Sequence, residues 1–123
     1  MSNKIIIIAG DPNSVNSEII HKAWKKLDNK IKKKIYLIAN YDLIYKQFKK
    51  LGYNTNLIKI KNLEDKIVSN YLKIIDIPIN FKNPFKVNFK ASSKYVLKSL
   101  NLAHNLANKK KSKQLLTVQL IKI

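Results

Sequence analysis

The sequence predicts an α/β fold, with a mainly parallel sheet and flanking helices, and two observations carry this prediction. Short, largely apolar runs recur along the chain, and the first of them, residues 5–9, is continuous, as expected for a strand covered on both faces. They occupy residues 5–9, 35–39, 57–60, 72–77 and 115–120. Segments with the apolar spacing of helices lie between these runs. Because strands that alternate with helices favour parallel pairing, and no linker or repeat is visible, we expect one domain unit over residues 1–123.

Three helices are predicted between these strands. Residues 17–27 follow several able N-cap side chains and carry Glu18 at the positive end, and residues 42–51 are stopped by Gly52. The longest helical pattern covers residues 91–107. Its expected inward face is formed by Val96, Leu100, Ala103 and Ala107. A weaker helix or loop is expected at residues 63–68.

The net charge is +18, and all 25 basic residues are lysines. Proteins that read nucleic acids rely on arginine for bidentate contacts, so a specific nucleic-acid partner is not expected. Lysine, asparagine and isoleucine are abundant while glycine occurs only at Gly10 and Gly52, a composition that A/T-rich codons produce without any partner. The alternative is a basic surface selected for an anionic partner.

Other residue classes exclude several kinds of site. The chain has no cysteine, so it can form neither disulfides nor cysteine metal sites. No signal peptide or membrane-spanning stretch is visible, and a cytoplasmic location is expected. His21 and His104 are the only histidines and have no carboxylate cluster beside them, so we expect packing or surface roles and neither a metal site nor a catalytic triad.

The most informative segment is the turn Gly10-Asp11-Pro12, which joins the first strand to the first helix. Gly10 can adopt the backbone angles of a sharp turn, and Pro12 stiffens its exit. Ligands of open α/β sheets bind at the carboxyl ends of strands, so these three residues are expected to line a crevice, with Asp11 facing it. The alternative is that Asp11 only caps the turn through local backbone bonds. The segment has neither the dinucleotide-binding G-x-G-x-x-G pattern nor a P-loop.

This segment resembles the opening motif of the 4-hydroxythreonine-4-phosphate dehydrogenases, the PdxA family. That motif is similar to G-D-P-A-G-I-G-P-E, and residues 10–18 read G-D-P-N-S-V-N-S-E, so that Gly10, Asp11, Pro12 and Glu18 match. A weaker likeness covers residues 35–52 and 91–107. The resemblance implies an incomplete piece of a two-domain α/β/α enzyme of the isocitrate/isopropylmalate-dehydrogenase type.

The resemblance also implies an activity. Members of this family are homodimeric, NAD-dependent oxidoreductases that act on 4-phosphohydroxy-L-threonine in pyridoxal phosphate biosynthesis, where oxidation is followed by decarboxylation. A divalent metal held by three histidines assists. Those histidines, the substrate-binding His-Thr pair and most of the cofactor site have no counterpart in residues 1–123. We therefore expect a truncated N-terminal segment that is inactive alone, with no metal or cofactor of its own.

The last residues depart from the family pattern, in which a strand leads to a Gly-Pro or Cys-Pro turn. Val118 and Gln119 replace that turn. An A/T-rich codon assignment read two bases later restores a family-like strand and turn, which fits a reading-frame change near Lys113. We therefore expect strand pairing through about Thr117 and a frayed tail beyond it.

Two rival interpretations stay open. One is a small stand-alone basic α/β module that binds anions or nucleic acid non-specifically. The other is a non-functional product that is partly unfolded because its sheet lacks partner strands.

We predict that the chain binds duplex DNA weakly and without sequence preference, because dispersed lysines contact only phosphates. Fluorescence anisotropy with two unrelated duplexes should show most of the binding lost between about 50 mM and about 200 mM salt. A sequence-specific complex that persists at physiological salt would contradict the codon explanation of the charge.

Overall fold

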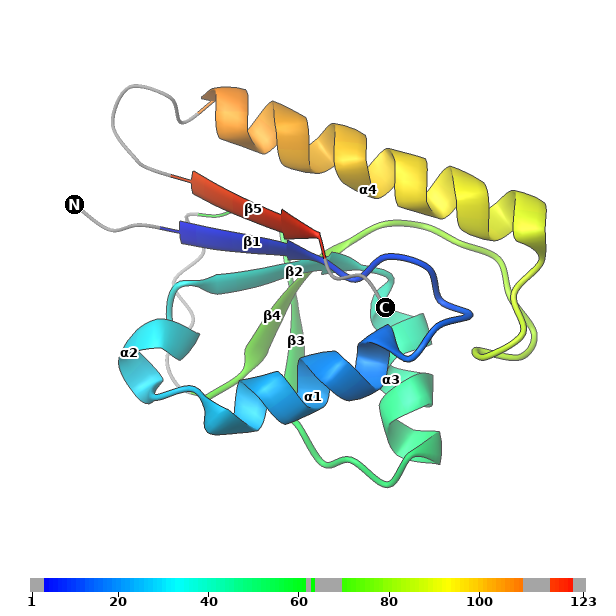
Figure 1. Cartoon of the computed structure of the whole chain (residues 1–123), viewed down its shortest axis with the longest axis horizontal. Helices are drawn as coiled ribbons and strands as arrows, with labels where there is room; N and C mark the ends of the chain where they lie inside the picture. The colour runs from blue at the N-terminus through cyan, green and yellow to red at the C-terminus, as the bar shows by residue number, and fades with distance from the viewer. Residues whose placement is uncertain (1–3, 62, 64–69, 110–115, 121–123) are drawn as a thin grey trace.

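The computed structural model describes residues 4–61, 63, 70–109 and 116–120 (Figure 1). They form five parallel strands in the order β3-β4-β2-β1-β5. The elements are β1 (Lys4–Ile8), α1 (Asn16–Lys26), α2 (Asn29–Lys32), β2 (Ile35–Ala39), α3 (Tyr41–Lys50), β3 (Leu57–Ile60), β4 (Leu72–Asp76), α4 (Phe89–Lys109) and β5 (Leu116–Leu120).

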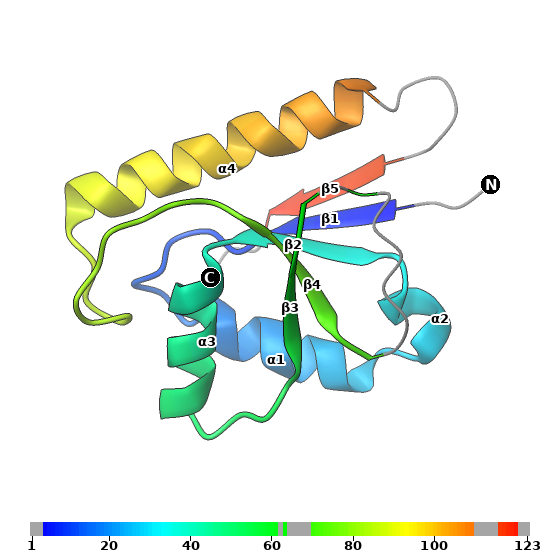
Figure 2. The same ribbon diagram turned by 180° about the vertical axis from the view of Figure 1, so that it is seen from behind.

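The sheet lies between two helical layers. Helices α1, α2 and α3 cover one face and α4 covers the other, as the two opposite views show (Figures 1 and 2). Each face has its own apolar cluster, one built around Ile6 and Ile38 under α4, the other around Trp24 and Phe48 under α1 and α3. Every residue of β2 is buried, which explains its continuous apolar sequence. The predicted α/β fold with a mainly parallel sheet is therefore confirmed.

Local chemistry accounts for most element boundaries. Gly52 has φ +76°, and the amide N–H of Tyr53 donates to the Phe48 carbonyl, so α3 ends where the sequence predicted. Helix α2 was not predicted; the Asp28 carboxylate caps it by accepting the Ile31 amide N–H at 2.9 Å. Most of the predicted segment 63–68 lies outside the described residues. None of the helices in the described ranges combines the length and apolarity that a bilayer crossing requires.

The expected inward face of α4 is partly wrong. Leu100 is 39% exposed, whereas Tyr95 and Ser99 are each 1% exposed. The Ser99 hydroxyl donates to the Tyr95 carbonyl one turn earlier at 2.8 Å, so its burial leaves no unsatisfied donor. The Tyr95 hydroxyl accepts the Asn40 backbone N–H at 2.8 Å, so Tyr95 faces the sheet.

The expected end of the last strand is also wrong. Strand β5 pairs with β1 from Leu116 to Leu120, where Leu120 lies opposite Ile8, rather than stopping near Thr117. A parallel ladder uses only backbone N–H and C=O groups, so it tolerates a sequence that departs from the family pattern.

His21 anchors α1 to the segment that follows α3. Its buried ring stacks on Tyr53 with centroids 3.8 Å apart and meets Phe48 edge-on at 5.6 Å, while its Nδ1 lies 2.6 Å from the Thr55 hydroxyl oxygen. Burial, with help from Lys25 and Lys22, lowers the pKa of His21. The packing role expected for this histidine is therefore observed.

We predict that protonation of His21 destabilises the fold. The unfolded chain takes up a proton near the ordinary pKa of 6.5, while the folded chain resists it. The free energy of unfolding should therefore fall as the pH drops from about 7 to about 5. Urea unfolding should show a flatter pH profile for His21→Gln, and an unchanged slope for the control His104→Gln on the exposed side of α4. Equal slopes in wild type and His21→Gln would contradict the prediction.

Candidate functional site

The connections of the sheet place a topological switch point between β2 and β4. These strands are neighbours, yet β2 leads to α3 on one face and β4 leads toward α4 on the other (Figure 1). The two connections diverge at the carboxyl ends of these strands, the position where ligands bind in folds of this kind. Asn40 and Asp76 occupy this position.

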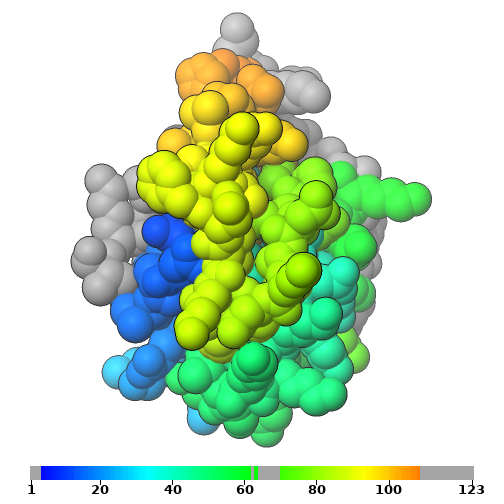
Figure 3. All heavy atoms as spheres, turned by 90° about the vertical axis from the view of Figure 1, so that its right-hand side faces the viewer, coloured from blue at the N-terminus to red at the C-terminus, as the bar shows by residue number. Residues whose placement is uncertain are grey.

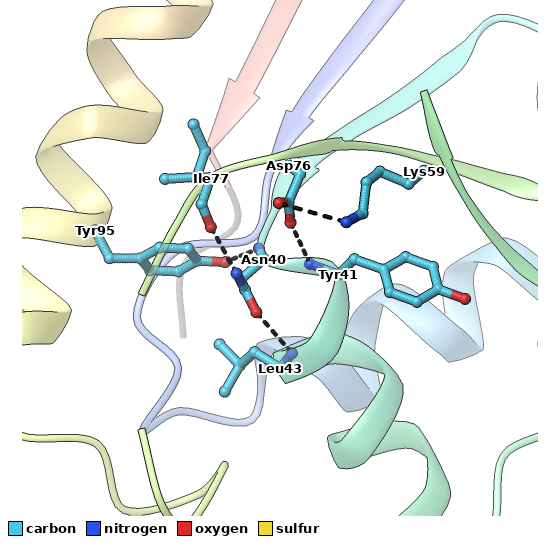
Figure 4. Close-up of polar contacts among 7 residues, drawn as sticks. All are labelled: Asn40, Tyr41, Leu43, Lys59, Asp76, Ile77 and Tyr95. Atoms are coloured by element: carbon cyan, nitrogen blue, oxygen red, sulfur yellow. Dashed lines mark hydrogen bonds and ion pairs between the residues drawn. The ribbon is translucent and has the colours of Figure 1, made fainter. Parts of the chain in front are cut away.

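Asn40 joins three elements at the switch point (Figure 4). Its backbone N–H donates to the Tyr95 hydroxyl of α4 at 2.8 Å, and its Nδ2 donates to the Ile77 carbonyl at 2.8 Å. Its Oδ1 accepts the Leu43 amide N–H at 2.9 Å and so caps α3. Every one of these contacts is structural, so Asn40 fixes the end of β2 to α3, to α4 and to the residue that follows β4.

Asp76 and Tyr95 complete this network. One carboxylate oxygen of Asp76 accepts the Tyr41 amide N–H at 2.8 Å, and the other lies 3.9 Å from Lys59 Nζ. Burial raises the pKa of Tyr95, and the Asp76 charge adds to the effect, so the phenol stays protonated at neutral pH. Tyr95 therefore orients groups in this network and does not act as a base at neutral pH.

The sequence-predicted turn lies at the end of β1, one strand away from the switch point. Gly10 adopts φ +79°, which a residue with a side chain rarely does. The Asp11 side chain is exposed, and its Oδ1 accepts the Asn13 amide N–H at 2.9 Å. The Ser14 hydroxyl donates to the Asp11 carbonyl at 2.7 Å. These contacts close the turn on itself, and the crevice role of Gly10, Asp11 and Pro12 stays a prediction.

Two side chains tie this turn to the connection between β4 and α4. Asn13 bonds both ways with Val87, donating Nδ2 to the carbonyl at 2.8 Å and accepting the amide N–H at 2.7 Å. Gln47 is 2% exposed, and its Nε2 donates to the carbonyls of Pro12 and Pro84 at 2.9 and 2.7 Å. Neither Asn13 nor Gln47 stands out as a site residue in the sequence, although a polar Gln47 on the inward side of a predicted helix is a signal for a buried hydrogen bond.

A dinucleotide does not fit at this turn in the conformation described. The cavity that Gly10, Asp11 and Pro12 line has a volume of about 10 Å³, enough for one water molecule at most. Ser17 also lines it, and within the described residues its buried hydroxyl has no hydrogen-bond partner. Three amide N–H groups at the turn are already engaged: Asn13 N donates to the Asp11 carboxylate, Ser14 N to the Asp11 carbonyl and Asn16 N to the Ser14 hydroxyl. The residues therefore do not form a pyrophosphate cradle.

The donor set for a metal does not fit either. Within the part of the chain that the structure describes, no three His, Cys, Asp or Glu side chains are grouped closely enough to hold an ion. His21 belongs to α1 and His104 to α4, and these helices lie on opposite faces of the sheet. His104 contacts Asn108 at 3.1 Å. No metal-assisted step can be assigned to these residues.

We predict that Gln47→Leu lowers the free energy of unfolding by about 2 kcal/mol, because it leaves two buried carbonyls without donors. Urea unfolding followed by Trp24 fluorescence measures this. Lys50→Leu, an exposed change on the same helix, serves as the control and should have little effect. Equal stability of Gln47→Leu and wild type would show that Gln47 does not hold the β1–α1 turn to the β4–α4 connection.

Comparisons with known proteins agree on one family, although no family model matches the chain. The 4-hydroxythreonine-4-phosphate dehydrogenase of Sulfurihydrogenibium sp. (strain YO3AOP1) is 34% identical over 97 residues, which are 76% of this chain and 29% of that protein. The chain thus spans less than a third of this relative's length.

Solved structures show the same fold. One from Salmonella typhimurium, described as a 4-hydroxythreonine-4-phosphate dehydrogenase, has a TM-score of 0.76 at 19% identity over 99% of this chain and 38% of that chain. The Klebsiella pneumoniae enzyme has a TM-score of 0.73 at 17% identity over 98% of this chain and 38% of that chain. In sequence and in fold, this chain is therefore similar to one part of the 4-hydroxythreonine-4-phosphate dehydrogenases, the PdxA family.

Proposed function

We propose that this chain is the N-terminal part of an NAD-dependent dehydrogenase that oxidises 4-phosphohydroxy-L-threonine in pyridoxal phosphate biosynthesis. One observation carries the proposal: sequence identity of 34% over 97 residues points to the same family as the fold, which covers 99% of the chain. Decarboxylation of the oxidised product, a homodimeric assembly and a cytoplasmic location belong to the same proposal.

In this proposal the chain supplies one wall of the substrate crevice. The turn Gly10-Asp11-Pro12 and the switch point at Asn40 and Asp76 lie at the carboxyl edge of the sheet, where such crevices form. NAD would supply the hydride acceptor and a divalent metal the Lewis acid, and both groups would be held by residues outside this sequence. With only His21 and His104 in 123 residues, a three-histidine metal set has to come from residues outside this sequence.

We predict that the purified chain does not reduce NAD when it is given 4-phosphohydroxy-L-threonine, with or without zinc, magnesium or cobalt. Absorbance of NADH measures this, with the full-length Sulfurihydrogenibium enzyme as the positive control. Turnover that survives repurification and scales with the amount of chain would overturn the assignment of the metal set to other residues.

A fusion tests the family activity itself. We expect this chain, joined to the remaining part of the Sulfurihydrogenibium enzyme, to oxidise the substrate when metal is present. In that fusion Asp11→Asn should lower kcat, whereas Asp42→Asn, an exposed carboxylate in the first turn of α3, should not. A folded fusion without activity would contradict the proposed function, and equal effects of the two substitutions would contradict the role of Asp11.

A further inference from the structure

A groove with a volume of about 480 Å³ opens between α4 and the connection that leads to it from β4. Figure 3 faces this side of the molecule and shows the start of α4 beside that connection. Polar or charged side chains from both segments line the groove, namely Asn80, Asn88, Lys90, Lys94 and Lys98. We propose that this groove binds a small phosphorylated molecule through its lysine stripe, Lys90, Lys94 and Lys98.

The spacing of the stripe concentrates positive charge on one side of α4. Residues four positions apart are neighbours on a helix, so Lys90, Lys94 and Lys98 form a row. Like charges at this spacing repel each other. No acidic residue lines the groove, and the two ion pairs recorded within the described residues use Lys22 and Lys59 instead. A bound anion would relieve this repulsion, which no carboxylate in the described structure does.

The side chains favour phosphate chemistry. A lysine ammonium is a compact point charge with three donors, and it binds phosphate oxygens as a point charge without the planar fork of arginine. The Asn88 side-chain oxygen accepts the amide N–H groups of Lys90 and Ala91 at 2.8 and 3.2 Å. The Nδ2 group of Asn88 can therefore donate its N–H groups to an anion in the groove.

The size and floor of the groove favour a small ester over a polymer. A volume near 480 Å³ falls within the range of small-molecule sites. Pro78, Ile79 and Ala91 give it apolar surface against which a short carbon skeleton can pack. This assignment does not depend on the dehydrogenase proposal, because it uses only residues on the α4 side of the sheet.

The test is an NMR titration of the ¹⁵N-labelled full chain with glycerol 3-phosphate at a constant ionic strength of about 0.15 M. Amide shifts should saturate and concentrate at residues 88–98. Lys94→Gln should weaken binding about fivefold, the upper range for one exposed charge pair. Lys26→Gln removes the same charge from α1 on the opposite face and should change the affinity far less.

Further titrations identify the ligand chemistry. Inorganic phosphate that binds as tightly as glycerol 3-phosphate would support the site and assign it to the phosphate group alone, while tighter binding of the ester would add the apolar floor. Malate that binds equally well would overturn the proposal, because phosphate chemistry would then not be recognised. Shifts that never saturate, or equal weakening by Lys26→Gln and Lys94→Gln, would overturn it as well, since both indicate diffuse attraction to a basic protein.

Discussion

The hydrogen bond from the Asn40 backbone N–H to the Tyr95 hydroxyl determines how α4 lies on the sheet. Both groups are buried, and a buried donor or acceptor left without a partner is far more costly than an ordinary hydrogen bond is stabilising. In the orientation of α4 that makes this contact, Ser99 is buried while Leu97 and Leu100 are exposed. The observed face of α4 combines this polar contact with the packing of Ala91, Leu102 and Leu106 against the core.

The same orientation of α4 decides which of its side chains lie near the carboxyl edge of the sheet. It places the ring of Tyr95 against the groove on one side while its hydroxyl contacts the switch point on the other. Lys90, Lys94 and Lys98 consequently line the groove. The β1–α1 turn, by contrast, is closed by its own side chains and by Gln47. Of these two regions, only the groove beside α4 has room for a ligand of more than a few atoms.

The relation to PdxA enzymes gives these features a context. The chain matches less than two fifths of the length of its relatives. Asn13 stands where the family motif has alanine, and here it bonds both ways to Val87. The turn is therefore held to the neighbouring connection by a contact that an alanine could not make.

The amino-acid sequence by itself determined the class of fold and the family. Apolar runs such as residues 35–39 and the stop at Gly52 are local signals, because strand burial and helix termination depend on a few adjacent residues. The resemblance at residues 10–18 was equally local. Even the packing role of His21 followed from its helical setting.

Only the tertiary structure decided the strand order, the rotation of α4 and the contacts that build the carboxyl edge. Asn13 and Val87 are 74 residues apart, Asn40 and Tyr95 are 55 apart, and Gln47 and Pro84 are 37 apart. Such pairs depend on which strands become neighbours, and a periodic pattern within one segment carries no information about its partner. The groove beside α4 has the same origin, since its walls come from two segments that meet only after the sheet has formed.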